Sequence, residues 1–182
     1  MRRLLLAGLV ILVGTLAGYA GWYAQRHIDE SSPAPSGVSS ETLRQLTSLQ
    51  LDDTQGRPTA VSQWQGKVLV VNFWATWCPP CRREMPVLDA AQHKWADKGV
   101  QVVGIGIDDA ASIRSYAAAN KLGFPLLVAG PELIDLTVTL GNAAQGLPFS
   151  VVIGRDGTLK HTKLGPFTAE ALDAMIAPLI AR

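Results

Sequence analysis

The stretch from Val68 to Pro86 constrains the fold of this chain more than any other part. It opens with an apolar, valine-rich run, VLVVNF, and continues through WATWCPPC into a segment whose apolar residues recur at helical spacing. A short apolar run bounded by turn formers is typical of a strand buried on both faces, as in a parallel sheet. Cys78 and Cys81, the chain's two cysteines, stand between this strand and the helix. The stretch therefore predicts a strand, a sharp turn with two thiols, and a helix.

Further strand and helix patterns alternate along the chain, which predicts an α/β fold. The Arg155-Asp156-Gly157 turn lies between two strand patterns and adds an antiparallel pair at one sheet edge. We expect strands at residues 47–51, 68–73, 100–108, 124–128, 150–153 and 159–164, and helices at residues 79–98, 110–121, 132–140 and 169–180.

The charge distribution excludes a nucleic-acid-binding role, because the net charge is only +1 and the charges are scattered. Two cysteines at C-x-x-C spacing are too few to hold a fold together. They can form one local disulfide or supply half of a metal site.

The N-terminal residues carry the pattern of a membrane anchor. Residues 4–24 contain no charged side chain and would span about 31 Å as a helix, enough for a hydrocarbon core of ~30 Å. Arg2 and Arg3 precede this run, so the positive-inside rule places the rest of the chain outside the cytoplasm. We expect a single-pass anchor, residues 1–25, in the inner membrane, with the domain facing the periplasm. A cleaved signal peptide is the alternative, because Gly18-Tyr19-Ala20 offers small residues at suitable positions.

Residues 26–41 are predicted to form a flexible tether, because the segment SSPAPSGVSS is small, polar and contains proline. The folded domain is then expected over residues 42–182.

Residues 70–86, VVNFWATWCPPCRREMP, resemble the active-site segment of thioredoxin-fold proteins. The match is closest to the membrane-anchored thiol–disulfide oxidoreductases of the TlpA/ResA type. Gly66-Lys67, the sequence Gly146-Leu147-Pro148-Phe149, and the Gly154–Gly157 turn fit the same family. The resemblance implies a thioredoxin-like fold with a mixed central sheet flanked by helices. It also implies an exposed first cysteine and an inserted strand–helix element, for which residues 124–140 are the candidate.

The family's chemistry assigns Cys78 as the nucleophile and Cys81 as the resolving thiol. A helix N-terminus stabilises a thiolate through its unpaired N–H groups and dipole. Pro79 and Pro80 lack two of those N–H groups, so we expect moderate stabilisation. No histidine separates the cysteines, which favours a reductase over an oxidase.

Glu84 shares a helix face with Cys81, which lies three residues before it. The resemblance to relatives with the C-x-x-C-x-x-E pattern implies that Glu84 relays the proton of the Cys81 thiol. Many thioredoxins carry a buried aspartate where this chain has Asn72, and an amide cannot act as a base. Glu84 is then the nearest acid–base candidate, although a solvated surface carboxylate is the other interpretation.

The substrate groove is expected to involve Trp77, Pro79, Pro80, Leu147 and Pro148. The family resemblance implies a cis peptide bond at Pro148 and backbone pairing between Leu147 and a bound peptide. Trp74 either flanks this groove or packs in the core.

Three functions remain open from the sequence. The first is reduction of protein disulfides, with apocytochrome c or copper-site assembly proteins as substrates and a membrane thiol-transfer protein as electron donor. The second is a copper-binding protein with Cys78 and Cys81 as soft ligands, for which His161 would have to supply a further ligand. The third is a redox sensor. We expect a monomer without a resident cofactor or metal.

Overall fold

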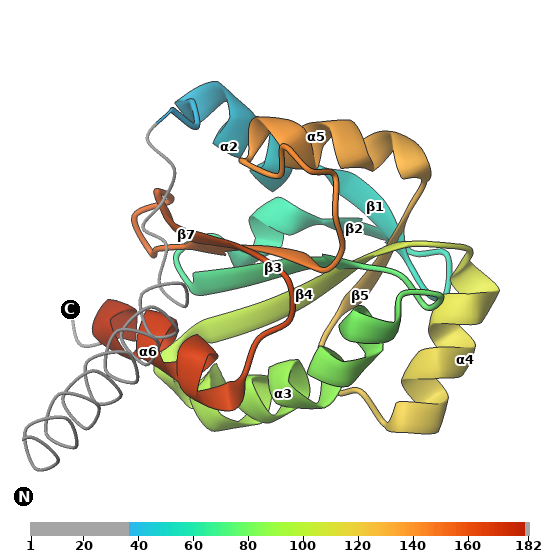
Figure 1. The fold of residues 1–182 in the computed structure, drawn as a ribbon. Coiled ribbons are helices and arrows are strands. Elements are labelled where there is room, and N and C mark those ends of the chain that lie inside the picture. The colour runs from blue at the N-terminus through green and yellow to red at the C-terminus, as the bar shows by residue number, and fades with distance from the viewer. Residues whose placement is uncertain (1–36, 181–182) are drawn as a thin grey trace, which may run out of the picture. The chain divides into compact units, whose positions relative to one another are not determined.

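Strand β3 (Val68–Trp74) lies inside a seven-stranded mixed sheet with the order β2-β1-β5-β4-β3-β6-β7, in a computed structural model that describes residues 37–180 (Figure 1). The other strands are β1 (Gln50–Asp53), β2 (Pro58–Ala60), β4 (Val100–Ile107), β5 (Leu126–Ala129), β6 (Phe149–Ile153) and β7 (Leu159–Leu164). The α-helices are α2 (Ser40–Thr47), α3 (Pro79–Trp95), α4 (Ala110–Asn120), α5 (Ile134–Thr139) and α6 (Ala169–Ile180). Short 3-10 turns cover Val61–Trp64, Ala96–Lys98 and Pro131–Leu133.

The buried central strands confirm the interpretation of the valine-rich runs. Every residue of β3 and of β4 is buried. Strand β3 pairs in parallel with β4 and antiparallel with β6, and β5 adds a further parallel strand to β4. Because helices cover both faces, these strands are mostly apolar without alternation, and Asn72 and Gln101 are their polar exceptions.

The two faces of the sheet bury two separate sets of side chains. Helices α3 and α6 cover one face, on which Trp74, Met85 and Leu172 belong to the same apolar cluster. Helices α2 and α5 lie on the opposite face, where Leu46 and Phe149 pack (Figure 1). This arrangement holds α3 rigidly against the sheet, so that its N-terminus emerges directly after β3.

The N-terminal part of the domain differs from the sequence prediction. Helix α2 (Ser40–Thr47) precedes the first strand, and that strand is β1 at Gln50–Asp53 rather than residues 47–51. Ser39 caps this helix by accepting a hydrogen bond from the Thr42 N–H at 3.0 Å. Leu46, fully buried, packs against the sheet. A helix of eight residues depends on such tertiary packing, which a local pattern does not reveal.

Residues 124–140 form the inserted strand–helix element that was expected. They contain β5 (Leu126–Ala129), a 3-10 turn and α5 (Ile134–Thr139). Another antiparallel pair, β1 with β2, closes the sheet edge opposite β7. Strand β2 (Pro58–Ala60) is not among the strands that the sequence pattern predicted.

The expected membrane anchor, residues 1–25, lies outside the described residues, as does most of the expected tether. Over residues 37–180, no helix combines the length and apolar character needed to cross a membrane.

Gly104 on β4 is expected to tolerate no side chain. A Cβ there would lie 2.6 Å from Cδ2 of Leu126 and 3.2 Å from both the Phe124 ring and the Trp74 indole nitrogen. The Gly104→Ala variant should therefore lower the free energy of unfolding by about 1–3 kcal/mol, measured by urea denaturation. Ala118→Leu on the exposed side of α4 is the control and should change it little. An unchanged stability of Gly104→Ala would show that the three neighbours can move apart freely.

Candidate active site

Cys78 and Cys81 form a disulfide at the N-terminus of α3. Cys78 is the residue that caps the helix, and its Sγ lies 3.3 Å from the N–H of Cys81, which points toward it. Pro79 and Pro80 occupy the first two helical positions. Both lack an N–H, so the Cys81 amide is the first helical donor that can reach Sγ. This confirms that the proline pair withholds two donors from the sulfur.

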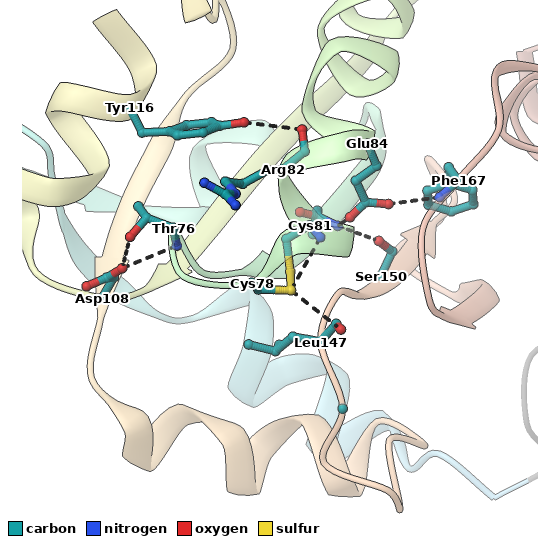
Figure 2. The surroundings of a disulfide bond; sticks show 12 residues. Thr76, Cys78, Cys81, Arg82, Glu84, Asp108, Tyr116, Leu147, Ser150 and Phe167 are labelled. Carbon is teal, nitrogen blue, oxygen red and sulfur yellow. Dashed lines mark hydrogen bonds between the residues drawn. A yellow bond between two sulfur atoms is a disulfide. The ribbon is translucent and has the colours of Figure 1, made fainter. Parts of the chain in front are cut away.

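The expectation of an exposed first cysteine is wrong for the disulfide form. Cys78 is only 4% exposed, and Cys81 is fully buried. The Cys78 sulfur is covered by its partner sulfur and by the carbonyl oxygen of Leu147 at 3.6 Å (Figure 2). In the disulfide this sulfur carries no proton, so the approach is a contact; a reduced Cys78 thiol could donate a hydrogen bond there.

An apolar groove reaches Cys78. Its volume is about 520 Å³, and none of its lining residues is charged. Trp77, 67% exposed, forms part of one side, and the prolines of the CPPC turn continue it. The full lining is Trp77, Cys78, Pro79, Pro80, Ile107, Pro131, Ile134, Gln145 and Leu147. Four of the five residues predicted for the substrate groove are thus brought together beside Cys78.

Pro148, the fifth, is buried behind the groove and does not line it. The Leu147–Pro148 peptide bond is cis, as expected. The carbonyl of Pro148 accepts a hydrogen bond from the Gly165 N–H at 2.8 Å. Among the described residues, the N–H of Leu147 meets no acceptor, so the Leu147 backbone is available to an extended peptide in the groove. The cis bond at Pro148 thus sets the direction in which the chain leaves Leu147.

Glu84 is fully buried, which rules out a solvated surface carboxylate. Its Oε1 accepts a hydrogen bond from Nδ2 of Asn72 at 2.7 Å, and its Oε2 accepts one from the Phe167 N–H at 2.9 Å. Glu84 lies on the helix that also carries Cys81, and Figure 2 shows its carboxylate directed toward Phe167, in the loop before α6. Asn72 also donates to Oγ of Ser150 at 2.9 Å, its cross-strand partner in β6.

Burial raises the pKa of Glu84 from its ordinary value of 4.5 to about 7. The lost hydration of the carboxylate is the main cause. Hydrogen bonds from Phe167 and Asn72, and the positive charge of Lys163, oppose this rise without cancelling it. A carboxyl group with this pKa exchanges protons near neutral pH, as an acid–base catalyst must. Glu84 is thus a buried carboxyl group with a pKa near neutral, on the same helix as Cys81.

The loop before the disulfide is held by contacts that the sequence did not reveal. Both the N–H and the hydroxyl of Thr76 donate to Oδ2 of Asp108, which follows β4. On the helical side, the Tyr116 hydroxyl donates to the carbonyl of Arg82 at 3.2 Å (Figure 2). Trp74 is fully buried and packs on Tyr116, which settles its role as a core residue.

In the described part of the chain, no group of three histidine, cysteine or acidic residues could hold a metal ion. His161 lies on β7, where it pairs with Val152 in β6. It does not join the two cysteines.

Comparisons with known proteins agree with this geometry. The Redoxin family matches residues 30–176. The thioredoxin-like protein YneN of Bacillus subtilis is 26% identical over 178 residues, 95% of this chain and 96% of that protein. The thiol–disulfide oxidoreductase ResA of Bacillus thuringiensis subspecies konkukian is 31% identical over 123 residues, 66% of this chain and 68% of that protein.

Among solved structures, a thiol:disulfide interchange protein of the thioredoxin family from Chlorobium tepidum superimposes with a TM-score of 0.67. It is 29% identical, and the match covers 82% of this chain and 97% of that one. StoA from Bacillus subtilis, at 23% identity and a TM-score of 0.56, shares the fold.

Proposed function

The chain belongs to the Redoxin family and is a thiol–disulfide oxidoreductase of the ResA type, and we propose that it works as a reductase of protein disulfides. The observation that carries the proposal is the Cys78–Cys81 pair, which caps a helix beside an uncharged groove. The N–H of Leu147, which has no acceptor within residues 37–180, borders the same groove. A peptide that pairs with this backbone would bring its own disulfide to the Cys78 sulfur.

The reaction proceeds by two thiol–disulfide exchanges. The Cys78 thiolate attacks one sulfur of the substrate disulfide, forming a mixed disulfide and releasing the other substrate sulfur as a thiolate. The Cys81 thiol gives up its proton and its sulfur attacks Sγ of Cys78, which breaks the mixed disulfide and releases the second substrate thiol. The substrate gains two electrons, and the Cys78–Cys81 disulfide is formed.

Glu84 is proposed to accept the proton of the Cys81 thiol in the second exchange. Three features support this role: its place one helical turn after Cys81, its complete burial, and its pKa of about 7. Above that pH the carboxylate is ionised and can act as a base. Asn72 donates to it and keeps its oxygens at a fixed position.

The direction of transfer is proposed from the turn between the cysteines. Pro79 and Pro80 supply neither an N–H nor a cationic side chain to stabilise the Cys78 thiolate. Since strong stabilisation of the thiolate makes a strong oxidant, this turn favours a reductant.

The setting of the reaction is proposed from residues 4–24, whose charge-free run suits a membrane anchor with the domain on the periplasmic side. Outside the cytoplasm no reduced thiol pool is expected, so electrons would come from a membrane thiol-transfer protein. Apocytochrome c cysteines or those of copper-site assembly proteins are the proposed substrates.

Equilibration of the protein with glutathione buffers tests the direction. We expect a reduction potential more negative than about −200 mV, together with catalysis of insulin reduction. Substituting histidine for Pro80 should move the potential toward the oxidising side, because a cationic ring near Cys78 stabilises its thiolate. A wild-type potential close to about −120 mV, with rapid oxidation of reduced peptides, would contradict the reductase assignment.

A further inference from the structure

The groove beside Cys78 is lined by the CPPC turn with Trp77, by Ile107, and by two further segments, here called its two walls. Leu147 comes from the loop that enters β6, whereas Ile134 and Pro131 come from the inserted element around α5. The separation of these walls determines whether a peptide can lie with its disulfide at the Cys78 sulfur. A residue that fixes one wall relative to the other would therefore control access of protein substrates.

Asn142 lies between the two segments and is only 1% exposed, yet it does not line the groove. Its Nδ2 donates to the carbonyl of Gly146 and to Oγ1 of Thr137, each at 3.0 Å. Its Oδ1 accepts a hydrogen bond from the Gly146 N–H at 3.1 Å. The amide thus uses both nitrogen hydrogens and its oxygen, and it holds both backbone groups of the residue before Leu147.

The hydrogen bonds continue from Asn142 into α5. The hydroxyl of Thr137 accepts from Asn142 and donates to the carbonyl of Ile134 at 2.7 Å. Ile134 lines one wall of the groove, and Gly146 adjoins Leu147 on the other. A continuous path of hydrogen bonds therefore joins the two walls through two buried side chains, those of Asn142 and Thr137.

The loop held by Asn142 includes an unfavourable backbone conformation. Gln145 has a φ of 52°, in the left-handed region that costs a residue with a side chain roughly 1 kcal/mol. Its N–H donates to the Asn142 carbonyl at 2.9 Å. Without the side-chain contacts to Gly146, this loop would be free to relax, and Leu147 would move with it.

We infer that Asn142 is a positioning residue that holds the two walls of the groove at the spacing needed by protein substrates. It acts through Leu147 and Ile134 and does not touch the substrate. The inference rests on the proposed function, because it concerns binding of a protein disulfide at Cys78. A small disulfide that needs no groove should react independently of Asn142.

The test compares two substrates with the reduced full-length chain. Asn142→Ala should lower the second-order rate constant for insulin roughly tenfold while changing that for hydroxyethyl disulfide less than about twofold. The reduction potential should stay the same, since the cysteines and their helix are unaltered. Thr137→Val removes only the side-chain link to α5 and leaves in place the hydrogen bond that the Asn142 N–H donates to the Thr137 carbonyl at 2.9 Å. It should give a smaller loss of the same kind, about threefold.

Gln101→Ala is the matched control, because Gln101 is also a buried amide that donates to a backbone carbonyl. It lies at the start of β4, whereas the groove is lined by Ile107 at the other end of that strand. The Gln101→Ala variant should lose stability in urea without changing the ratio of the two rates. Equal losses on both substrates in Asn142→Ala, or the same ratio change in Gln101→Ala, would overturn the inference. If Asn142→Ala does not fold, an unchanged ratio in Thr137→Val overturns it. Failure of the wild-type chain to reduce either substrate would instead reject the proposed function.

Discussion

Replacing Cys81 with serine is expected to stop turnover and to accumulate a mixed disulfide between Cys78 and the substrate protein. The first exchange needs only the Cys78 thiolate, which remains at the helix N-terminus. The second exchange needs the Cys81 sulfur, and a serine hydroxyl does not attack a disulfide. Insulin reduction should fall to the background rate, and the adduct should appear on non-reducing gels and disappear with dithiothreitol.

The chain itself supplies the control for this trap, because it has no cysteine besides Cys78 and Cys81. Cys78→Ser should lose turnover as well, but it should trap little protein, since the remaining thiol is fully buried on α3. The double variant must trap none. Stronger trapping by Cys78→Ser than by Cys81→Ser would reverse the assigned roles of the two cysteines. Applied to an extract of the native host, the Cys81→Ser trap also identifies the physiological substrate.

Glu84→Gln is expected to remove the neutral-pH step from the rate profile. In the wild type, the rate of the second exchange should rise with pH through about 7, as the carboxyl group loses its proton and becomes a base. The variant should lack this rise and react on the order of a hundredfold more slowly above that pH. Its rate should then follow the ionisation of the Cys81 thiol alone.

The control for this variant is Glu170→Gln, which makes the same chemical change at an exposed position in the first turn of α6. It should keep the wild-type profile. The readout is single-turnover oxidation of the pre-reduced protein by insulin, followed across the pH range. If Glu84→Gln retained a step near pH 7, the relay would belong to another group.

The same substitution should change how stability depends on pH. The folded protein holds the Glu84 proton more tightly than the unfolded chain does, because its pKa is raised from 4.5 to about 7. This stabilisation is fully present below pH 4.5 and is lost as pH rises through about 7, a change of about 3 kcal/mol. Relative to Glu84→Gln, the oxidised wild type should therefore become less stable over that window. The free energy of unfolding of both proteins is measured in urea at several pH values. A difference between them that stays constant from pH 4.5 to about 7 would contradict the raised pKa.

The placement of the two thiols was predictable because it depends on neighbouring residues. A buried strand, a CPPC turn with prolines at the first helical positions, and the helix after it follow from residues 68–95 alone. The alternation of strands and helices likewise predicted the α/β class. The cis bond at Pro148 came from the family resemblance, since composition does not distinguish it from an ordinary proline.

The surroundings of Glu84 were not predictable in this way. Helical spacing places Glu84 near Cys81, but it gives no information about what covers that face of α3. The covering groups come from far along the chain: the Phe167 N–H is 83 residues away, and Asn72 depends on the β3–β6 register that also places Ser150 beside it. A raised pKa requires burial, and burial is a property of the assembled fold.

By itself, then, the sequence determined which atoms react: two thiols three residues apart at the start of a helix, in a chain of the α/β class. Tertiary structure alone decided that Glu84 is desolvated, that Cys78 is covered in the disulfide form, and that Asn142 connects the two walls of the groove. The physical reason is the range of the interactions. Local spacing and capping act over one or two helical turns, whereas desolvation and groove shape depend on residues that only strand pairing and packing bring together.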